Sequence, residues 1–338
     1  MKIENSYKRI NRNLGIEILR MILCFWVISF HCLNKNNISY FLYFITKTKF
    51  YHVPCFSFIS FYYSYNIFCG ASKKNVLKRL ERLLIPYIVW PLLIFLKHNI
   101  IHFIFNNSGR YISFHDLKIQ LITGWGFVIP LWFLFSIAFL SLFFFILSNI
   151  FRKYFLLITQ LLALLSYIMQ YSQIYDCLNN YKKNIKMPII FSISIFPISV
   201  FGLSFASLEL MNTLKLNRYK TIFFSFVILI LMLKYRFFVV MNGYEGIEYI
   251  FSSLFLFIGF YLIPLEKAFL QFQILIKYIT RYTNGIYCLQ GHVFSLVKLK
   301  IDKKGTFKTS VISYIILYFI SFIGSKISGK SKFKYLFE

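Results

Sequence analysis

The sequence predicts an all-α, polytopic integral membrane protein with about ten transmembrane helices in one bundle, and three observations support this fold class. Of the 338 residues, 58% are hydrophobic and only 14% are charged, whereas soluble domains carry roughly 25% charged residues. Apolar runs of about 17–25 residues, long enough to cross a bilayer as helices, recur along the whole chain. These runs have almost none of the polar face that a helix on a soluble domain needs.

The candidate spans follow one another without a long linker or soluble insertion, and the longest polar loop, 106–129, is short. We therefore expect a single membrane domain over residues 1–338 with no appended soluble domain. The expected spans are 14–33, 50–70, 83–105, 130–150, 153–174, 188–208, 219–240, 247–264, 277–297 and 309–326.

The formal net charge of +27 does not indicate a nucleic-acid partner, because the basic residues lie in short segments between apolar runs. Such loops interact with anionic lipid head groups and set the orientation of the helices. The stretch 72–82 carries five positive charges and favours a cytoplasmic N-terminus, although the five lysines in 298–308 point the other way. We expect a multi-pass protein of the cell inner or plasma membrane, with membrane lipids as partners.

The first span contains three ionisable residues, Glu17, Arg20 and His31. Eleven helical positions advance about 16 Å and return to within about 20° of the starting direction, so Arg20 and His31 share a helix face. Glu17 is three residues before Arg20 and is expected to pair with it. A charge inside a bilayer costs at least about 2.5–3.5 kcal/mol, so this face needs partners, water or substrate. The alternative is a structural ion pair near the head groups.

A second group is Arg79 and Arg82, three residues apart where the third span begins. Both guanidinium groups can point to one side of a helix. Arginine binds phosphate in a bidentate manner that lysine does not reproduce, so the pair suits the phosphates of a nucleotide-like donor. The alternative is a basic loop that only sets topology.

No metal site is predicted. The six cysteines form no Cys-x-x-Cys pair. His98 and His102 have the i, i+4 spacing of a ligand pair but lack the Glu of a His-Glu-x-x-His motif, and the alternative of a metal site there stays open. These histidines, and His52 at the start of the second span, are expected at the membrane interface.

Five short motifs, in order from residue 13 to about 292, resemble those of the acyltransferase-3 family of membrane-bound carbohydrate O-acyltransferases. Arg20 and His31 match the family's Arg-x10-His signature, and Arg79 with Arg82 matches its Arg-x-x-Arg motif. The others are Val-Pro-Cys-Phe through Ser at 53–60, Leu-Trp-Phe-Leu-Phe at 131–135, and Thr-Asn-Gly-Ile-Tyr-Cys-Leu at 283–289.

The resemblance implies an enzyme that moves an acyl group, usually acetyl from acetyl-CoA, to a glycan or glycolipid acceptor, with no bound cofactor. It implies that His31 is the catalytic histidine, acting as base or acyl acceptor, and that Arg20 stabilises charge in the same cavity. Arg79 and Arg82 are implied to bind the donor. Supporting roles fall to Glu17, and to Trp132 and Tyr287 as residues that line the cavity.

The chain departs from the family pattern at three positions. Pro130 stands where many relatives have a histidine, Gln290 replaces a histidine after the Gly-Ile-Tyr segment, and Phe61 replaces the glycine of a Ser-Gly pair. Two other functions remain open. A polysaccharide or lipid-linked glycan transporter, or flippase, would also place charges in a membrane cavity. A membrane glycosyltransferase is disfavoured because the loop 34–49 contains no acidic residue.

Overall fold

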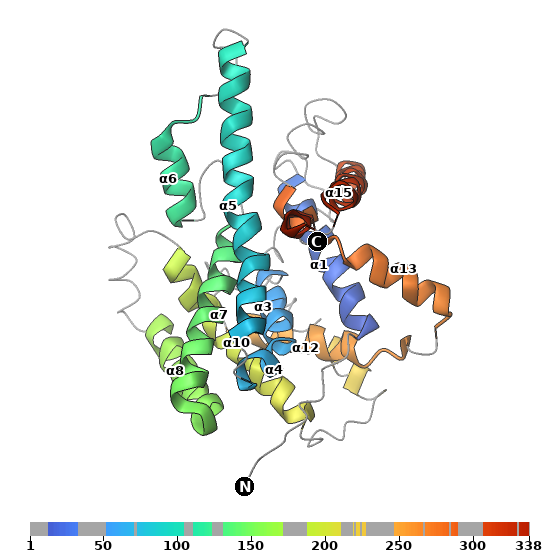
Figure 1. Cartoon of the computed structure of the whole chain (residues 1–338). Coiled ribbons are helices and arrows are strands. Elements are labelled where there is room, and N and C mark those ends of the chain that lie inside the picture. Colours follow the sequence, from blue (N-terminus) through green and yellow to red (C-terminus); the bar gives the residue numbers. More distant parts are fainter. Residues whose placement is uncertain are drawn as a thin grey trace.

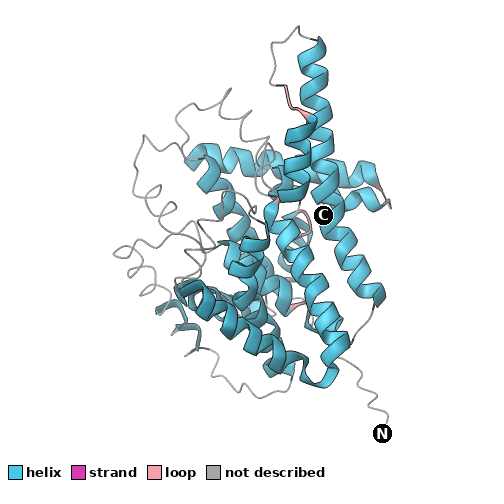
Figure 2. Cartoon of the chain, turned by 90° about the vertical axis from the view of Figure 1, so that its left-hand side faces the viewer, coloured by secondary structure: helices cyan, strands magenta, loops and turns pink. Residues whose placement is uncertain are grey.

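The computed structural model describes residues 13–32, 52–70, 73–104, 111–123, 131–171, 188–210, 219, 221–223, 225–227, 247–265, 268–283, 285–289, 307–329 and 331–337. Every element named within these ranges is helical (Figures 1 and 2). The elements are α1 (Leu14–Cys32), α3 (His52–Tyr62), α4 (Tyr65–Cys69), α5 (Lys73–Ile104), α6 (Phe114–Thr123), α7 (Trp132–Phe151), η1 (Arg152–Tyr154), α8 (Phe155–Tyr171), α10 (Pro188–Leu210), α12 (Ile247–Tyr261), α13 (Leu270–Thr280), α15 (Phe307–Ser328) and η4 (Lys332–Leu336).

Helix α3 lies among four others and contacts α1, α7, α10 and α12. Its rings interlock with theirs: the centroid of Phe257 lies 4.8 Å from that of Phe58 and 4.7 Å from that of Tyr62. Gly202 of α10 abuts the backbone carbonyl of Phe58, so that a β-carbon there would overlap the carbonyl oxygen. Small residues let helices in a membrane approach closely enough for such packing to hold them together.

Helix α1 packs against α12, α13 and α15. Its first turn is fixed by Asn13, whose side-chain oxygen accepts a hydrogen bond from the Ile16 N–H at 3.2 Å, as an N-cap residue does. The Asn13 amide nitrogen donates to the Tyr261 carbonyl at 2.9 Å, and the Asn13 N–H donates to the Tyr63 hydroxyl at 3.1 Å. The start of α1 therefore lies beside the ends of α3 and α12.

Two predicted spans have different bounds in the structure. Helix α5 begins at Lys73, ten residues before the expected start (Figure 1). Residues 73–82 of the basic stretch, expected to be a loop, are therefore helical. The span expected at 50–70 is divided by a turn at Tyr63 and Ser64 into α3 and α4. Arg79 and Arg82 therefore lie within a continuous helix, beyond its first turn.

Three helical stretches are long and apolar enough to cross a membrane: Lys73–Ile104, Trp132–Ile168 and Lys308–Ser328. The second comprises α7, η1 and most of α8. Shorter apolar helices occur at Ser192–Leu208 and Ile250–Tyr261. The all-helical membrane class is thus confirmed for the described residues, while the total of about ten spans stays a prediction, because most of 219–240 and the end of 277–297 lie outside them.

Candidate active site

The ion pair predicted in the first helix is present. Arg20 Nη1 lies 3.0 Å from Glu17 Oε2, and the side chains are 22% and 2% exposed. Arg20 Nη2 also donates to Thr283 Oγ1 at 2.8 Å, and the Cys24 thiol contacts the Thr283 carbonyl at 3.8 Å. Arg20 therefore joins α1 to the segment 283–289 that carries the Gly-Ile-Tyr motif.

His31 lies in the last turn of α1, about 16 Å along the helix from Arg20. The two residues share a face, as the spacing predicts, but the structure does not bring them together. Both terminal nitrogens of Arg20 bond elsewhere, to Glu17 and Thr283. The part that Arg20 plays with His31 in catalysis stays a prediction.

A second histidine lies near His31. His52, the first residue of α3, is 5% exposed and lies close enough to His31 for the two imidazoles to interact electrostatically. Its Nδ1 has no hydrogen-bond partner among the described residues. The sequence suggested an interfacial residue here. Its burial was missed because the sequence does not show that α1 and α3 run antiparallel, with the end of α1 beside the start of α3.

Arg79 turns into the bundle between three helices. Its Nε donates to Ser141 Oγ on α7 at 2.9 Å, and its Nη2 donates to Ser60 Oγ on α3 at 2.7 Å. The guanidinium carbon lies 5.3 Å from the centroid of the Phe61 ring, within range of a cation–π contact. Phe61, which replaces the family glycine, thus faces the Arg79 cation. Neither Ser60 nor Ser141 was identified from the sequence as a partner of Arg79.

Arg82 is exposed, and its guanidinium carbon lies 5.5 Å from the centroid of the Tyr335 ring. Arg79 and Arg82 are nevertheless close enough for their charges to repel. Glu81, the carboxylate between them in the sequence, pairs instead with Lys332 at 2.6 Å. Within the described part of the chain, neither arginine has a carboxylate partner.

Trp132 and Tyr287 meet at one aromatic group. The Phe133 ring lies 6.0 Å from the Trp132 ring and 5.8 Å from the Tyr287 ring, and both Trp132 and Tyr287 are buried. Phe56 of α3 also packs on Phe133, at 6.3 Å. The start of α7 and the Gly-Ile-Tyr segment, far apart in sequence, are therefore adjacent. Pro130 and Gln290 lie outside the described residues.

The histidines considered for a metal do not assemble a site. His98 Nδ1 interacts with the Ile94 carbonyl of its own helix at 3.0 Å. His102 packs on the Tyr111 ring at 5.5 Å. In the described ranges, no group of three potential metal-ligating side chains comes together.

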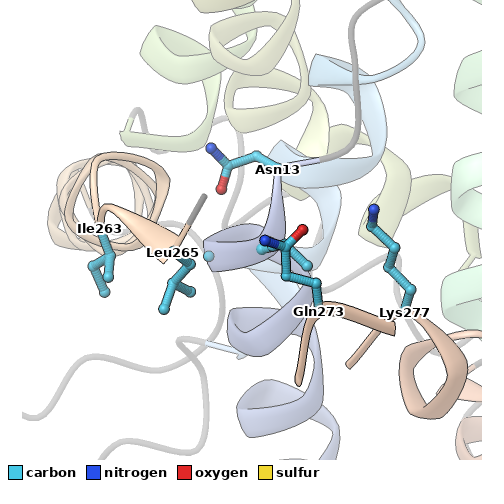
Figure 3. A pocket seen from close by; sticks show the side chains of 7 residues that line it. Asn13, Ile263, Leu265, Gln273 and Lys277 are labelled. Carbon is cyan, nitrogen blue, oxygen red and sulfur yellow. The ribbon is translucent and has the colours of Figure 1, made fainter. Parts of the chain in front are cut away.

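A polar pocket of about 200 Å³ opens beside the start of α1, between the turn after α12 and helix α13 (Figure 3). It is smaller than the roughly 300–1,000 Å³ of small-molecule sites, and none of the predicted site residues lines it. The lining residues are Asn13, Leu14, Gly15, Ile263, Leu265, Gln273 and Lys277.

These features define a helical membrane protein with ionisable side chains built into its bundle. The model of the acyltransferase-3 family, described as an acyltransferase domain, matches residues 13–328, and the chain belongs to this family. It is therefore an acyltransferase, and the transporter interpretation is not favoured. No curated protein and no solved structure matches the chain.

Proposed function

We propose that this acyltransferase transfers an acetyl group from acetyl-CoA to a hydroxyl of a cell-envelope glycan or glycolipid, in the cell inner or plasma membrane. The choice of acetyl-CoA as donor is supported by one observation. The cations Arg79 and Arg82 have no carboxylate partner among the described residues. Two repelling cations beside a membrane bundle are stabilised by an anion. The diphosphate of CoA supplies one, and arginine binds phosphate through parallel hydrogen bonds.

The arginines and the histidines lie towards opposite ends of α3. Ser60, which holds Arg79, is eight residues from His52, or about 12 Å along the helix. Donor phosphates bound at Arg79 would therefore remain well away from His31. The uncharged pantetheine arm of CoA is extended enough to cover such a separation, which supports a donor that binds at one end and reacts towards the other.

His31 is the residue that we assign to chemistry, since a neutral imidazole takes and returns a proton near neutral pH. The acceptor hydroxyl oxygen attacks the thioester carbonyl carbon while His31 takes the hydroxyl proton. The carbon–sulfur bond then breaks, and the proton passes from His31 to the CoA sulfur, leaving an ester and a free thiol. In the other route, the His31 nitrogen attacks the thioester carbonyl carbon and CoA leaves as its thiolate, giving an acyl-imidazole. The acceptor hydroxyl then attacks this acyl group, the carbon–nitrogen bond breaks, and the hydroxyl proton passes to the CoA thiolate, leaving an ester, a free thiol and neutral His31.

The other side chains have supporting roles in this proposal. Because Arg20 bonds Glu17 and Thr283, we assign it to holding the 283–289 segment in place rather than to stabilising an oxyanion at His31. That segment contains Tyr287. In this proposal Tyr287 and Trp132 line the route by which the acyl group reaches His31. We expect the N-terminus in the cytoplasm, since Arg79 lies towards the end of the bundle where α1 begins and acetyl-CoA is a cytoplasmic compound.

The test is mass spectrometry of envelope glycans from cells that carry the wild-type protein, His31→Ala, His98→Ala or an empty vector, with protein levels compared by blot. We expect an acetyl-sized mass gain with wild type and with His98→Ala, whose side chain bonds its own helix, and none with His31→Ala. A glycan mass that is unchanged by all forms refutes the proposed acceptor class. An unchanged gain with His31→Ala refutes the assigned histidine.

A further inference from the structure

The C-terminal segment, residues 331–337, folds back onto the helices. After α15 the chain reverses at Gly329, whose φ of +57° is a conformation that glycine adopts without steric cost. The following η4 packs against both α15 and α5. Figure 1 shows the C-terminal end lying against the helical part of the molecule instead of extending from it.

The last residues of this segment, Leu336 and Phe337, pack closely against the helical bundle. Leu336 is buried, and its carbonyl accepts a hydrogen bond from Trp90 Nε1 at 3.4 Å. The Phe337 ring packs edge-on against the Trp90 ring, with centroids 5.8 Å apart. A β-carbon on Gly285 or on Gly324 would overlap Phe337. Two glycines from separate elements thus leave room for this one residue, which indicates that its docked position is part of the fold.

The first residues of the segment reach the arginine pair. Lys332 Nζ lies 2.6 Å from Glu81 Oε1, and the pKa of Lys332 is raised by this hydrogen bond and by the Glu81 charge. The Tyr335 ring lies under the Arg82 guanidinium. An aromatic face holds a guanidinium while leaving its N–H groups directed outward. Arg82 therefore keeps its hydrogen-bond donors available to a ligand.

We propose that the C-terminal segment is part of the donor-binding site, with Tyr335 and Lys332 as positioning residues that prepare Arg82 and Arg79 for the phosphates of the acyl-CoA donor. Tyr335 restricts the guanidinium of Arg82. Lys332 neutralises Glu81, whose charge would otherwise oppose an approaching phosphate. The inference rests on the proposed function, because it assumes that the arginine pair binds the donor.

The experiment measures CoA affinity of the full-length protein in nanodiscs for wild type, Tyr335→Ala, Tyr335→Phe, Arg82→Ala and the double variant Arg82→Ala/Tyr335→Ala. An exposed cation–π contact is worth about 0.5–1 kcal/mol, so Tyr335→Ala is expected to weaken CoA binding about two- to fivefold. Tyr335→Phe keeps the ring and should bind as wild type does. Phe333→Ala, in the same segment with a side chain 58% exposed, is the matched control and should be neutral.

The double variant distinguishes a role of Tyr335 that acts through Arg82 from a purely structural role. If the ring acts through Arg82, Tyr335→Ala should cost nothing further once Arg82 is alanine. An equal loss in both backgrounds, or no loss on Tyr335→Ala while Arg82→Ala does weaken binding, overturns the inference and leaves the proposed donor site intact. Unchanged CoA affinity in Arg82→Ala overturns the assignment of Arg82 as a donor residue, and the inference with it.

The role of Lys332 has its own rescue test. Lys332→Gln leaves Glu81 unpaired and is expected to weaken CoA binding. Lys332→Gln/Glu81→Gln removes both charges and should restore the affinity. Failure of the second substitution to restore binding would show that Lys332 does not act by neutralising Glu81, and would overturn this part of the inference.

Discussion

Arg79 lies between α3 and α7 and bonds a serine on each. We therefore predict that a positive charge alone, as in Arg79→Lys, does not maintain full activity with acetyl-CoA. In Arg79→Lys the charge remains, but a single ammonium group cannot reproduce the planar fork that donates to both Ser60 and Ser141. At least one charge-assisted hydrogen bond is lost, which is worth about 1.5–3 kcal/mol. If these bonds aim the guanidinium at the donor, kcat/KM for acetyl-CoA should fall about 10- to 150-fold.

The assay is acetyl transfer to the acceptor by purified protein, with acetyl-CoA varied and the folded fraction checked by size-exclusion chromatography. Lys97→Ala removes an exposed cation from the same helix and serves as the control, with kinetics expected to match wild type. Arg79→Lys with wild-type kinetics, beside an inactive Arg79→Ala, would refute the argument from hydrogen-bond geometry. Wild-type kinetics in both would refute the assignment of Arg79 to the donor site.

Three other outcomes are expected. Glu17→Ala leaves Arg20 without its carboxylate partner. Because Arg20 is partly exposed, we expect the unfolding free energy to fall by about 1–3 kcal/mol, and by less in Glu17→Gln. Equal thermal stability of both variants and wild type would contradict this. Gly202→Ala should force α10 from α3 and cost about 1–3 kcal/mol, seen as a lower thermal midpoint. The raised pKa of Lys332 means that its pairing with Glu81 contributes fully below the unfolded pKa of about 10.4 and is lost as pH rises through the folded pKa. The protection of 331–337 against hydrogen exchange, taken relative to the intrinsic exchange rate at each pH, should therefore hold up to about pH 10 and fall above it.

Local spacing and run length predicted the features that depend on neighbours in sequence. The first helix was expected at 14–33 and is observed at Leu14–Cys32, because a long apolar run in a membrane has no alternative to a helix. The Glu17–Arg20 pair followed from i, i+3 spacing and is confirmed. The same spacing indicated that Arg79 and Arg82 can point to one side, whereas in the structure Arg79 enters the bundle and Arg82 stays at its surface.

Features that depend on distant segments were not predictable from the sequence. Trp90 bonds Leu336, 246 positions away, and Lys332 bonds Glu81, 251 positions away. No local pattern marks the C-terminal residues as partners of α5, since a basic, aromatic ending is equally compatible with an interfacial tail. Gly285 was noticed only as part of a motif. Its packing role depends on where Phe337 docks, which the fold alone determines.

The arginines Arg79 and Arg82 lie near one end of α3, and His31 and His52 lie near its other end. This separation has a physical reason if acyl-CoA is the donor. Moving phosphate charges into a bundle interior is very costly, whereas a thioester and an amide-containing arm lose far less on leaving water. A site that keeps Arg82 exposed and Arg79 just inside the bundle can hold the phosphates near water while the uncharged arm goes deeper. With such a donor, His31 and the buried His52 would meet the thioester away from the charged phosphates, and the burial of His52 would limit hydrolysis there. The arrangement of charge would thus limit how far the donor enters, and the imidazoles would mark the depth at which transfer takes place.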